Sequence, residues 1–217
     1  MASEFARQTF IDLGVPESKL IKNPFGTDLS RFKKVGDPDP KKFVVLWVGA
    51  ISLRKGFMYA LEAFNALDHP RKEFIVIGSQ TNEIETLIRD KRLDGVKFLG
   101  RVPNVELPKY YSEANVFILP SVEDGFGLVM GEALACGCPV IASMNTGARD
   151  LYEHGKEGFI IPIRDSKALA DAMQNLIDDP GLRARMSASA IEKVKSVKGW
   201  DFYGDRLAEE MQKLVGK

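Results

Sequence analysis

The chain alternates between short apolar runs and longer segments in which apolar residues recur every three or four positions. The apolar runs predict β-strands at Phe43–Val48, Phe74–Ile77, Val96–Leu99, Val116–Leu119, Pro139–Ala142 and Phe159–Pro162. The helical spacings predict helices at residues 3–13, Tyr59–Leu67, Ile84–Leu93, Leu107–Ser112, Leu128–Ala135, Lys167–Ile177, Leu182–Val194 and Phe202–Leu214. Strands and helices that alternate in this way are typical of a doubly wound, mainly parallel, Rossmann-like α/β sheet.

The segment before the first strong strand has a different character. It predicts a brief strand at Lys19–Lys22, a turn-rich loop at Asn23–Asp28 and a linker at Val35–Pro40. We therefore expect one domain over residues 1–217, with a leading helix, short strand and linker over 1–40, a core over 41–198 and a C-terminal helix over 199–217. The linker contains Asp37-Pro38-Asp39, a pattern that some transferases use to hold manganese. Because both aspartates precede prolines in a polar loop, a plain turn is the favoured interpretation.

Residues 115–150 have the features of a binding site. A glycine turn, Gly125–Gly127, lies between an apolar run and a helical run, so its backbone can approach a ligand closely. The free N–H groups that open the following helix favour an anion such as phosphate. Asp124 and Glu132 bracket the turn, and ionised carboxylates accept hydrogen bonds from paired hydroxyls. Phosphates flanked by hydroxyls are the layout of a nucleoside-diphosphate sugar.

Charge and composition exclude several other classes of protein. Lysine plus arginine and aspartate plus glutamate number 30 each, so no overall positive charge predicts nucleic-acid binding. The longest apolar run, Phe43–Ile51, is too short to span a bilayer, and the N-terminus does not resemble a signal peptide, which predicts a cytoplasmic protein. Cys136 and Cys138 are one residue apart, a spacing that suits small core residues better than a disulfide or zinc site.

Three common enzyme motifs are missing from the sequence. The loop after the first strand, Gly49–Arg54, lacks the spaced glycines of a dinucleotide-binding G-x-G-x-x-G motif. The chain also has no G-x-x-x-x-G-K-[ST] phosphate loop and no G-x-S-x-G nucleophile elbow. These absences count against an NAD-dependent dehydrogenase, a P-loop nucleotide hydrolase and an α/β-hydrolase.

Several short motifs follow one another along the chain in a characteristic order. They are Pro24–Asp28, Val48–Gly49 with Lys55–Gly56, Val76–Ser79, Phe98–Gly100, Leu119–Val140 and Glu153–Pro162. In this order and spacing, the chain resembles the C-terminal, donor-binding half of retaining glycosyltransferases of family 4, which have the GT-B fold. The resemblance covers nearly the whole chain.

The resemblance implies a role for each residue of the candidate site. Asp124 and Lys55 are the expected catalytic residues, with Asp124 facing the donor sugar and Lys55 contacting the phosphates. Glu132 is expected to bind both ribose hydroxyls. The other expected donor-binding residues are Gly49, Gly78, Arg101, Val102, Gly125, Phe126, Gly127, Leu128 and Val129. The implied ligand is a UDP-, GDP- or ADP-sugar, which acts as a substrate, so the resemblance implies no metal and no cofactor.

Two positions depart from the family pattern. Many members carry an arginine where this chain has Ala50, and Asp124 replaces a glutamate that is longer by about 1.5 Å. Arg54 and Glu123 are the nearest residues that could compensate.

The implied reaction is transfer of a hexose to a sugar or lipid-linked acceptor. GT-B enzymes bind the acceptor mostly through an N-terminal domain that this chain lacks, so we expect the chain alone to transfer sugar poorly or not at all. Any peripheral membrane association is expected only through that missing half. Two alternatives remain: a non-catalytic nucleotide-sugar-binding or scaffold module of the same fold, and a sugar-phosphate epimerase on a similar fold.

Overall fold

The protein is built around one parallel β-sheet. The structure, a computed structural model, describes residues 1–196 and 199–215. Its strands are β1 (Phe43–Val48), β2 (Lys72–Ile77), β3 (Val96–Gly100), β4 (Val116–Leu119), β5 (Val140–Ser143) and β6 (Gly158–Ile161). The six strands run in the order β3-β2-β1-β4-β5-β6, and every pairing is parallel. The predicted doubly wound sheet is therefore confirmed, and its strand order reverses between β1 and β4.

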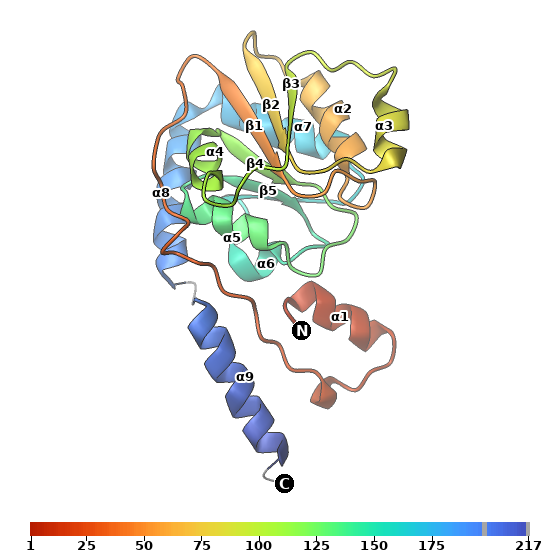
Figure 1. The fold of residues 1–217 in the computed structure, drawn as a ribbon, viewed down its shortest axis with the longest axis vertical. Coiled ribbons are helices and arrows are strands. Elements are labelled where there is room, and N and C mark those ends of the chain that lie inside the picture. Colours follow the sequence, from red (N-terminus) through yellow and green to blue (C-terminus); the bar gives the residue numbers. More distant parts are fainter. Residues whose placement is uncertain (197–198, 216–217) are drawn as a thin grey trace.

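Helices cover both faces of the sheet (Figure 1). They are α1 (Glu4–Asp12), α2 (Phe57–Ala66), α3 (Asn82–Ile88), α4 (Leu107–Glu113), α5 (Leu128–Ala135), α6 (Ala148–Leu151), α7 (Ser166–Asp178), α8 (Pro180–Ser196) and α9 (Trp200–Val215), with a short 3₁₀ helix at Glu17–Lys19. None of the helices in the described part of the chain has the length and apolar character needed to cross a bilayer.

Alternate residues of the inner strands point into two separate hydrophobic clusters. In β1, Val44 and Leu46 pack with residues of α4 and α5, whereas Val45 and Trp47 pack with residues of α2 and α7. All six residues of β1 are buried, because both faces of the sheet are covered. This explains why the inner strands appear in the sequence as continuous apolar runs.

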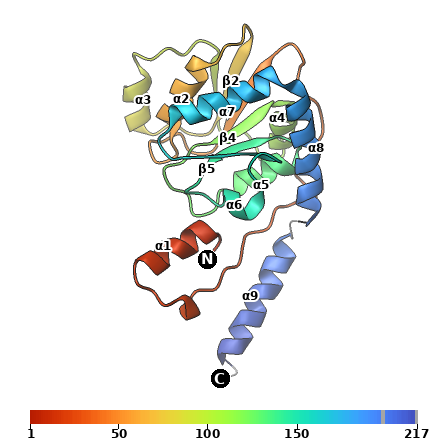
Figure 2. The same cartoon turned by 180° about the vertical axis from the view of Figure 1, so that it is seen from behind.

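The first helix and the last lie outside these layers. Figure 2 shows α1 and α9 at the same end of the molecule, beyond the sheet. The segment that contains Asn23 and Phe25 packs against α9. The Asn23 side-chain amide donates a hydrogen bond to the carbonyl of Tyr203 at 3.0 Å, and the centroid of the Phe25 ring lies 5.7 Å from that of Trp200.

Two details of the N-terminal and middle regions differ from the expectation. The predicted strand at Lys19–Lys22 is wrong: residues 17–19 form a 3₁₀ turn in which Leu20 N–H donates to Glu17 O at 3.0 Å, and no described strand pairs with it. Pro16 precedes this turn, and its carbonyl accepts a hydrogen bond from Lys19 N–H at 2.9 Å. The helix α6 was not predicted because its four residues are too few to show a periodic pattern.

Gly56 offers a test of the loop between β1 and α2. Its backbone has φ 82°, and an added Cβ would lie 2.0 Å from Pro120 O. We expect Gly56→Ala to lower the free energy of unfolding by about 2–3 kcal/mol, because the left-handed conformation and the contact both oppose a side chain. Urea denaturation would measure this.

The matched control is Gly204→Ala in α9, where an added Cβ meets nothing within 4 Å. This change should be neutral or stabilise by up to about 1 kcal/mol, because alanine favours a helix. Equal losses in the two variants would contradict the packing argument at Gly56.

Candidate functional site

A cavity of about 540 Å³ lies where the strand order reverses. Trp47, Val48 and Gly49 at the end of β1 line it, together with Leu119 at the end of β4. In doubly wound sheets the loops that follow such neighbouring strands run to opposite faces and leave a crevice for a ligand. The fold therefore places this cavity where a bound small molecule is expected.

The cavity gathers most of the predicted site residues. They are Gly49, Lys55, Asp124, Gly125, Phe126, Gly127, Leu128 and Val129. Four others do not line it: Gly78, Arg101, Val102 and Glu132 lie outside its wall.

Glycines at the ends of adjacent strands bring the backbone close together beside the cavity. Gly78 N–H donates to Gly100 O at 2.7 Å, and Gly49 N–H donates to Ile77 O at 2.9 Å. A Cβ on Gly78, which has φ 144°, would lie 1.9 Å from Gly49 O. Gly78 thus lets the turn after β2 pack directly against Gly49 in the turn after β1, with no side chain between them.

Two ion pairs join the loop after β1 to the loop after β4. Lys55 pairs with Asp124, and their side chains are only 19% and 14% exposed. Arg54 pairs with Glu123 at 3.1 Å, but their side chains are 55% and 57% exposed. Neither Arg54 nor Glu123 lines the cavity. The two residues that could compensate therefore pair with each other at the surface, whereas Lys55 and Asp124 lie inside the cavity.

Backbone contacts from the loop after β5 fix the position of Asp124. Its N–H donates to Asn145 O at 2.9 Å, and the Asn145 amide donates to Val122 O at 3.1 Å. The Asp124 carboxylate also accepts a hydrogen bond from Phe126 N–H at 3.4 Å. The sequence analysis does not single out Asn145, although its place in the loop just after the predicted strand Pro139–Ala142 is a signal of this edge.

The helix α5 begins at the cavity without a capping side chain. Its N-cap is Gly127, which has φ 80° and contributes no side chain, and Leu128 and Val129 of the first turn line the cavity. A Cβ on Gly127 would lie 2.7 Å from Leu119 Cδ2. The first N–H groups of a helix carry partial positive charge and bind anions. Together with Lys55 they form a site suited to phosphate.

Glu132 lies one turn further along α5 and faces α4. Its Oε2 accepts a hydrogen bond from the hydroxyl of the fully buried Tyr111 at 2.9 Å. Burial raises the pKa of the Glu132 carboxyl, an effect only partly opposed by Tyr111 and by the charge of Arg31. No other hydrogen bond to this carboxylate comes from residues 1–196 or 199–215. The carboxylate is therefore short of donors, which a pair of ligand hydroxyls would supply.

The first residues of the chain form a wall of the cavity that the sequence did not predict. Ala2 and Ala6 of the α1 region line it, and the Ser3 hydroxyl donates to Gly125 O at 2.5 Å. Phe25 packs edge-on against Phe126, with ring centroids 5.4 Å apart.

Several other candidate residues lie away from the cavity. Arg101 is exposed, and Val102 packs against the core cluster of α4 and α5. Asp37 pairs with Lys34 at 2.6 Å, and Asp39 accepts a hydrogen bond from Lys41 N–H at 2.9 Å, as expected of a turn. In the described part of the chain no three His, Cys, Asp or Glu residues are grouped to hold a metal ion.

Both cysteines are buried and unbridged, as expected for small core residues. Burial raises the pKa of Cys136 to about 12, so its thiol stays protonated at neutral pH.

Comparison with known proteins gives consistent matches. The sequence profile of the family described as "Glycosyl transferases group 1" matches residues 29–193. The chain is similar to the putative colanic acid biosynthesis glycosyltransferase WcaL of Escherichia coli (strain K12), with 30% identity over 219 residues that cover 94% of this chain and 52% of WcaL. The chain thus spans about half the length of the curated relatives it matches.

Two solved structures show the same fold. The C-terminal domain of the group 1 glycosyl transferase family protein LpcC from Francisella tularensis matches with a TM-score of 0.70 and 24% identity, over 79% of this chain and 97% of that domain. Anabaena Alr3699/HepE, solved in complex with UDP-glucose, matches with a TM-score of 0.84 and 23% identity, over 98% of this chain and 62% of HepE.

The raised pKa of Glu132 predicts a pH-dependent stability. In the unfolded chain this carboxyl titrates near 4.5, and in the folded protein it titrates higher. The folded state therefore binds the proton more tightly, so the stabilisation is fully present below pH 4.5 and is lost as the pH rises through the folded value. Glu132→Gln stays neutral and keeps an acceptor for Tyr111. We expect this variant to become more stable than the wild type as the pH rises towards neutrality.

Urea denaturation of both proteins at several pH values would measure the difference. Glu123→Gln, which changes an exposed carboxylate, is the control and should show little pH-dependent difference. A constant difference for Glu132→Gln, or one that favours the wild type at neutral pH, would contradict the assigned burial.

Proposed function

Because the chain belongs to the group 1 glycosyl transferase family, we propose that it binds the nucleoside-diphosphate sugar from which a retaining enzyme transfers a hexose to a sugar or lipid-linked acceptor. The observation that carries this proposal is the cavity between β1 and β4, in which Lys55 and the uncapped start of α5 converge. Both features attract a diphosphate, and Asp124 beside them accepts hydrogen bonds from sugar hydroxyls.

Lys55 and Asp124 exchange partners when the donor binds. Without ligand they neutralise each other inside the cavity. A diphosphate draws the ammonium of Lys55 away, and the Asp124 carboxylate is then available to the hydroxyls of the donor sugar. During transfer Lys55 and the α5 N-terminus stabilise the charge that develops on the departing diphosphate. The leaving phosphate helps to deprotonate the acceptor, and the anomeric configuration is retained.

Glu132 binds the ribose of the nucleotide. Its carboxylate has one donor, Tyr111, and a pKa that burial raises, so two ribose hydroxyls improve its environment. The base lies towards the end of β3, where backbone groups of Gly78 and of residues 100–102 hold it. Gly100 has φ 67° and an added Cβ there would meet nothing within 4 Å, which leaves room for a ring.

The acceptor is bound by a further domain in the whole enzyme. The chain spans 52% of WcaL, and apolar side chains are exposed on α1 and α9, among them Phe10, Met211 and Leu214. A second cavity of about 520 Å³ lies between α9 and the segment 19–25. We propose that residues 1–217 form one structural unit and that the acceptor domain covers these apolar faces.

One observation favours the alternative of a non-catalytic nucleotide-sugar-binding module. Ala50 lines the cavity where many relatives are expected to carry an arginine, so Lys55 is the one cationic side chain among its lining residues in the described chain. A site with one cation binds a diphosphate less tightly than a site with two.

Calorimetry with UDP, GDP and ADP tests the binding proposal. We expect one of the nucleotides to bind, and Glu132→Ala to weaken it about 10- to 150-fold, because a charge-assisted hydrogen bond to ribose is lost. Glu123→Ala is the matched control, since this carboxylate pairs with Arg54 outside the cavity. Equal affinity of the wild type and Glu132→Ala would refute the ribose assignment, and no binding of any nucleotide would refute the donor site.

The second test concerns transfer by the chain alone. Purified residues 1–217 incubated with UDP-, GDP- or ADP-hexose and a sugar or lipid acceptor should release little or no nucleoside diphosphate, because these residues span only about half the length of WcaL and the acceptor is expected to bind mostly to the other half. Nucleotide titration of the same preparation checks that its donor site is folded. Multiple turnovers by this chain would show that it contains a complete active site.

A further inference from the structure

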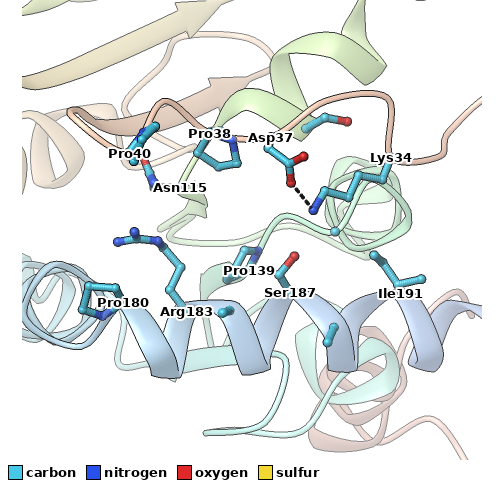
Figure 3. A pocket seen from close by; sticks show the side chains of 15 residues that line it. Lys34, Asp37, Pro38, Pro40, Asn115, Pro139, Pro180, Arg183, Ser187 and Ile191 are labelled. Carbon is cyan, nitrogen blue, oxygen red and sulfur yellow. Dashed lines mark ion pairs between the residues drawn. The ribbon is translucent and has the colours of Figure 1, made fainter.

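A separate cavity of about 390 Å³ lies at the opposite edge of the sheet (Figure 3). Its walls are the linker 34–40 on one side and α8 on the other, with Asn115 just before β4 and Pro139 just before β5. These are the amino-terminal ends of the strands, whereas the donor cavity lies at their carboxyl ends. No residue that lines this cavity also lines the donor cavity.

Arg183 brings an unneutralised positive charge to this cavity. Its Nη1 donates to Leu176 O at 2.8 Å, and its guanidinium lies 5.9 Å from the centre of the Phe43 ring. Burial lowers the pKa of this half-buried guanidinium, and no carboxylate in the described chain opposes that effect. An arginine has five N–H donors, so most of them have no carbonyl acceptor here.

The other charges around the cavity cancel. Lys34 and Asp37 form an ion pair at 2.6 Å on the linker side, which Figure 3 draws as a dashed line. Arg183 therefore leaves the lining with a net charge of one positive unit.

A second donor at the same place also lacks a partner. Asn115 is only 1% exposed, and its Oδ1 accepts a hydrogen bond from Val44 N–H at 2.6 Å. Because a backbone N–H can only donate, this bond fixes the orientation of the amide. Its Nδ2 is then left buried without an acceptor. In Figure 3, Asn115 lies above the Arg183 guanidinium, on the same side of the cavity.

Apart from Ser112, whose hydroxyl donates to Pro108 O at 2.7 Å, and Ser187 on α8, the rest of the lining is apolar. Proline rings 38, 40, 139 and 180 and Ile191 face the cavity, and the surface of α8 contributes alanines. Rigid rings of this kind pack against a flat or compact hydrocarbon body rather than against a hydrated ion. The volume is within the range of small-molecule pockets, roughly 300–1,000 Å³.

We propose that this cavity binds a small organic monocarboxylate with a compact apolar body. The carboxylate accepts from Arg183, whose planar donors match its two oxygens, and from the amide of Asn115. The apolar body lies between the proline rings. One positive charge favours a monoanion, because a phosphate dianion would keep an uncompensated charge in an apolar site.

The test uses 4-fluorobenzoate as the probe and ¹⁹F NMR to follow its binding to the full chain. We expect saturable binding, and Arg183→Met should weaken it at least about tenfold, because the charged partner of the carboxylate is lost. Arg185→Met is the matched control: it removes the same charge from α8, but Arg185 pairs with Asp179 at 3.4 Å and does not line the cavity. This control should bind the probe like the wild type.

A second variant covers the case in which Arg183→Met fails to fold. Ala188 is an exposed residue of α8 that lines the cavity, so Ala188→Phe fills the space from outside the core. It should abolish probe binding while thermal unfolding stays unchanged.

Several results would overturn the proposal. They are no binding to the wild type, equal binding to Arg183→Met or Ala188→Phe, equal binding of 4-fluorotoluene, which has no carboxylate, and displacement of the probe by inorganic phosphate at equal concentration. UDP distinguishes the two sites: displacement of the probe by UDP would place the probe in the donor cavity and refute a separate site, whereas simultaneous binding supports it.

Discussion

The pairing of β1 with β4 is the constraint on which the rest of the molecule depends. It joins Val45 to Val116 and Leu46 to Phe117, residues about 70 positions apart, at the centre of the sheet. From these two strands the chain winds outwards in both directions, so the loops that follow them leave in different directions. The cavity with Lys55 and Asp124 exists because of that divergence, and helices on both faces hold the two strands in place.

Backbone, more than side chains, shapes the wall of the donor cavity. Gly49, Gly78 and Gly127 have positive φ angles, and Cβ atoms on the last two would strike neighbouring atoms within 3 Å. Such a surface brings N–H groups close to a ligand without side chains in between. It also explains why the sequence does not identify the base or the sugar of the donor, since backbone groups at this edge are the same whatever the side chains around them.

The sequence was sufficient for the sheet and for the glycine turn, because both leave local patterns. Buried parallel strands appear as apolar runs, and a helix that opens at Gly127 appears as a glycine followed by helical spacing. The orientation of the Glu132 side chain leaves no such pattern in the sequence. It depends on Tyr111, which lies on another helix, and only the packing of α4 against α5 brings the two side chains together. The wall that Ser3 and Phe25 contribute is likewise a long-range contact.

The predicted strand at Lys19–Lys22 is wrong for a related reason, because a strand needs a partner strand: only Met1 exchanges backbone hydrogen bonds with Ile21 and Asn23, and none of the described strands pairs with this segment. The two ion pairs between neighbouring loops show the same limit. The sequence favours Lys55 for a phosphate and Asp124 for a sugar, with Arg54 and Glu123 beside them as residues that could compensate, but it does not show which of these side chains are buried. The structure distinguishes the two ion pairs by burial, because the side chains of Lys55 and Asp124 are only 19% and 14% exposed.

A buried ion pair of this kind has a desolvation cost that a bound diphosphate can offset by giving Lys55 a more highly charged partner. In the proposed complex Ala50 supplies no second cation, so the N–H groups of α5 would compensate the remaining charge of the diphosphate.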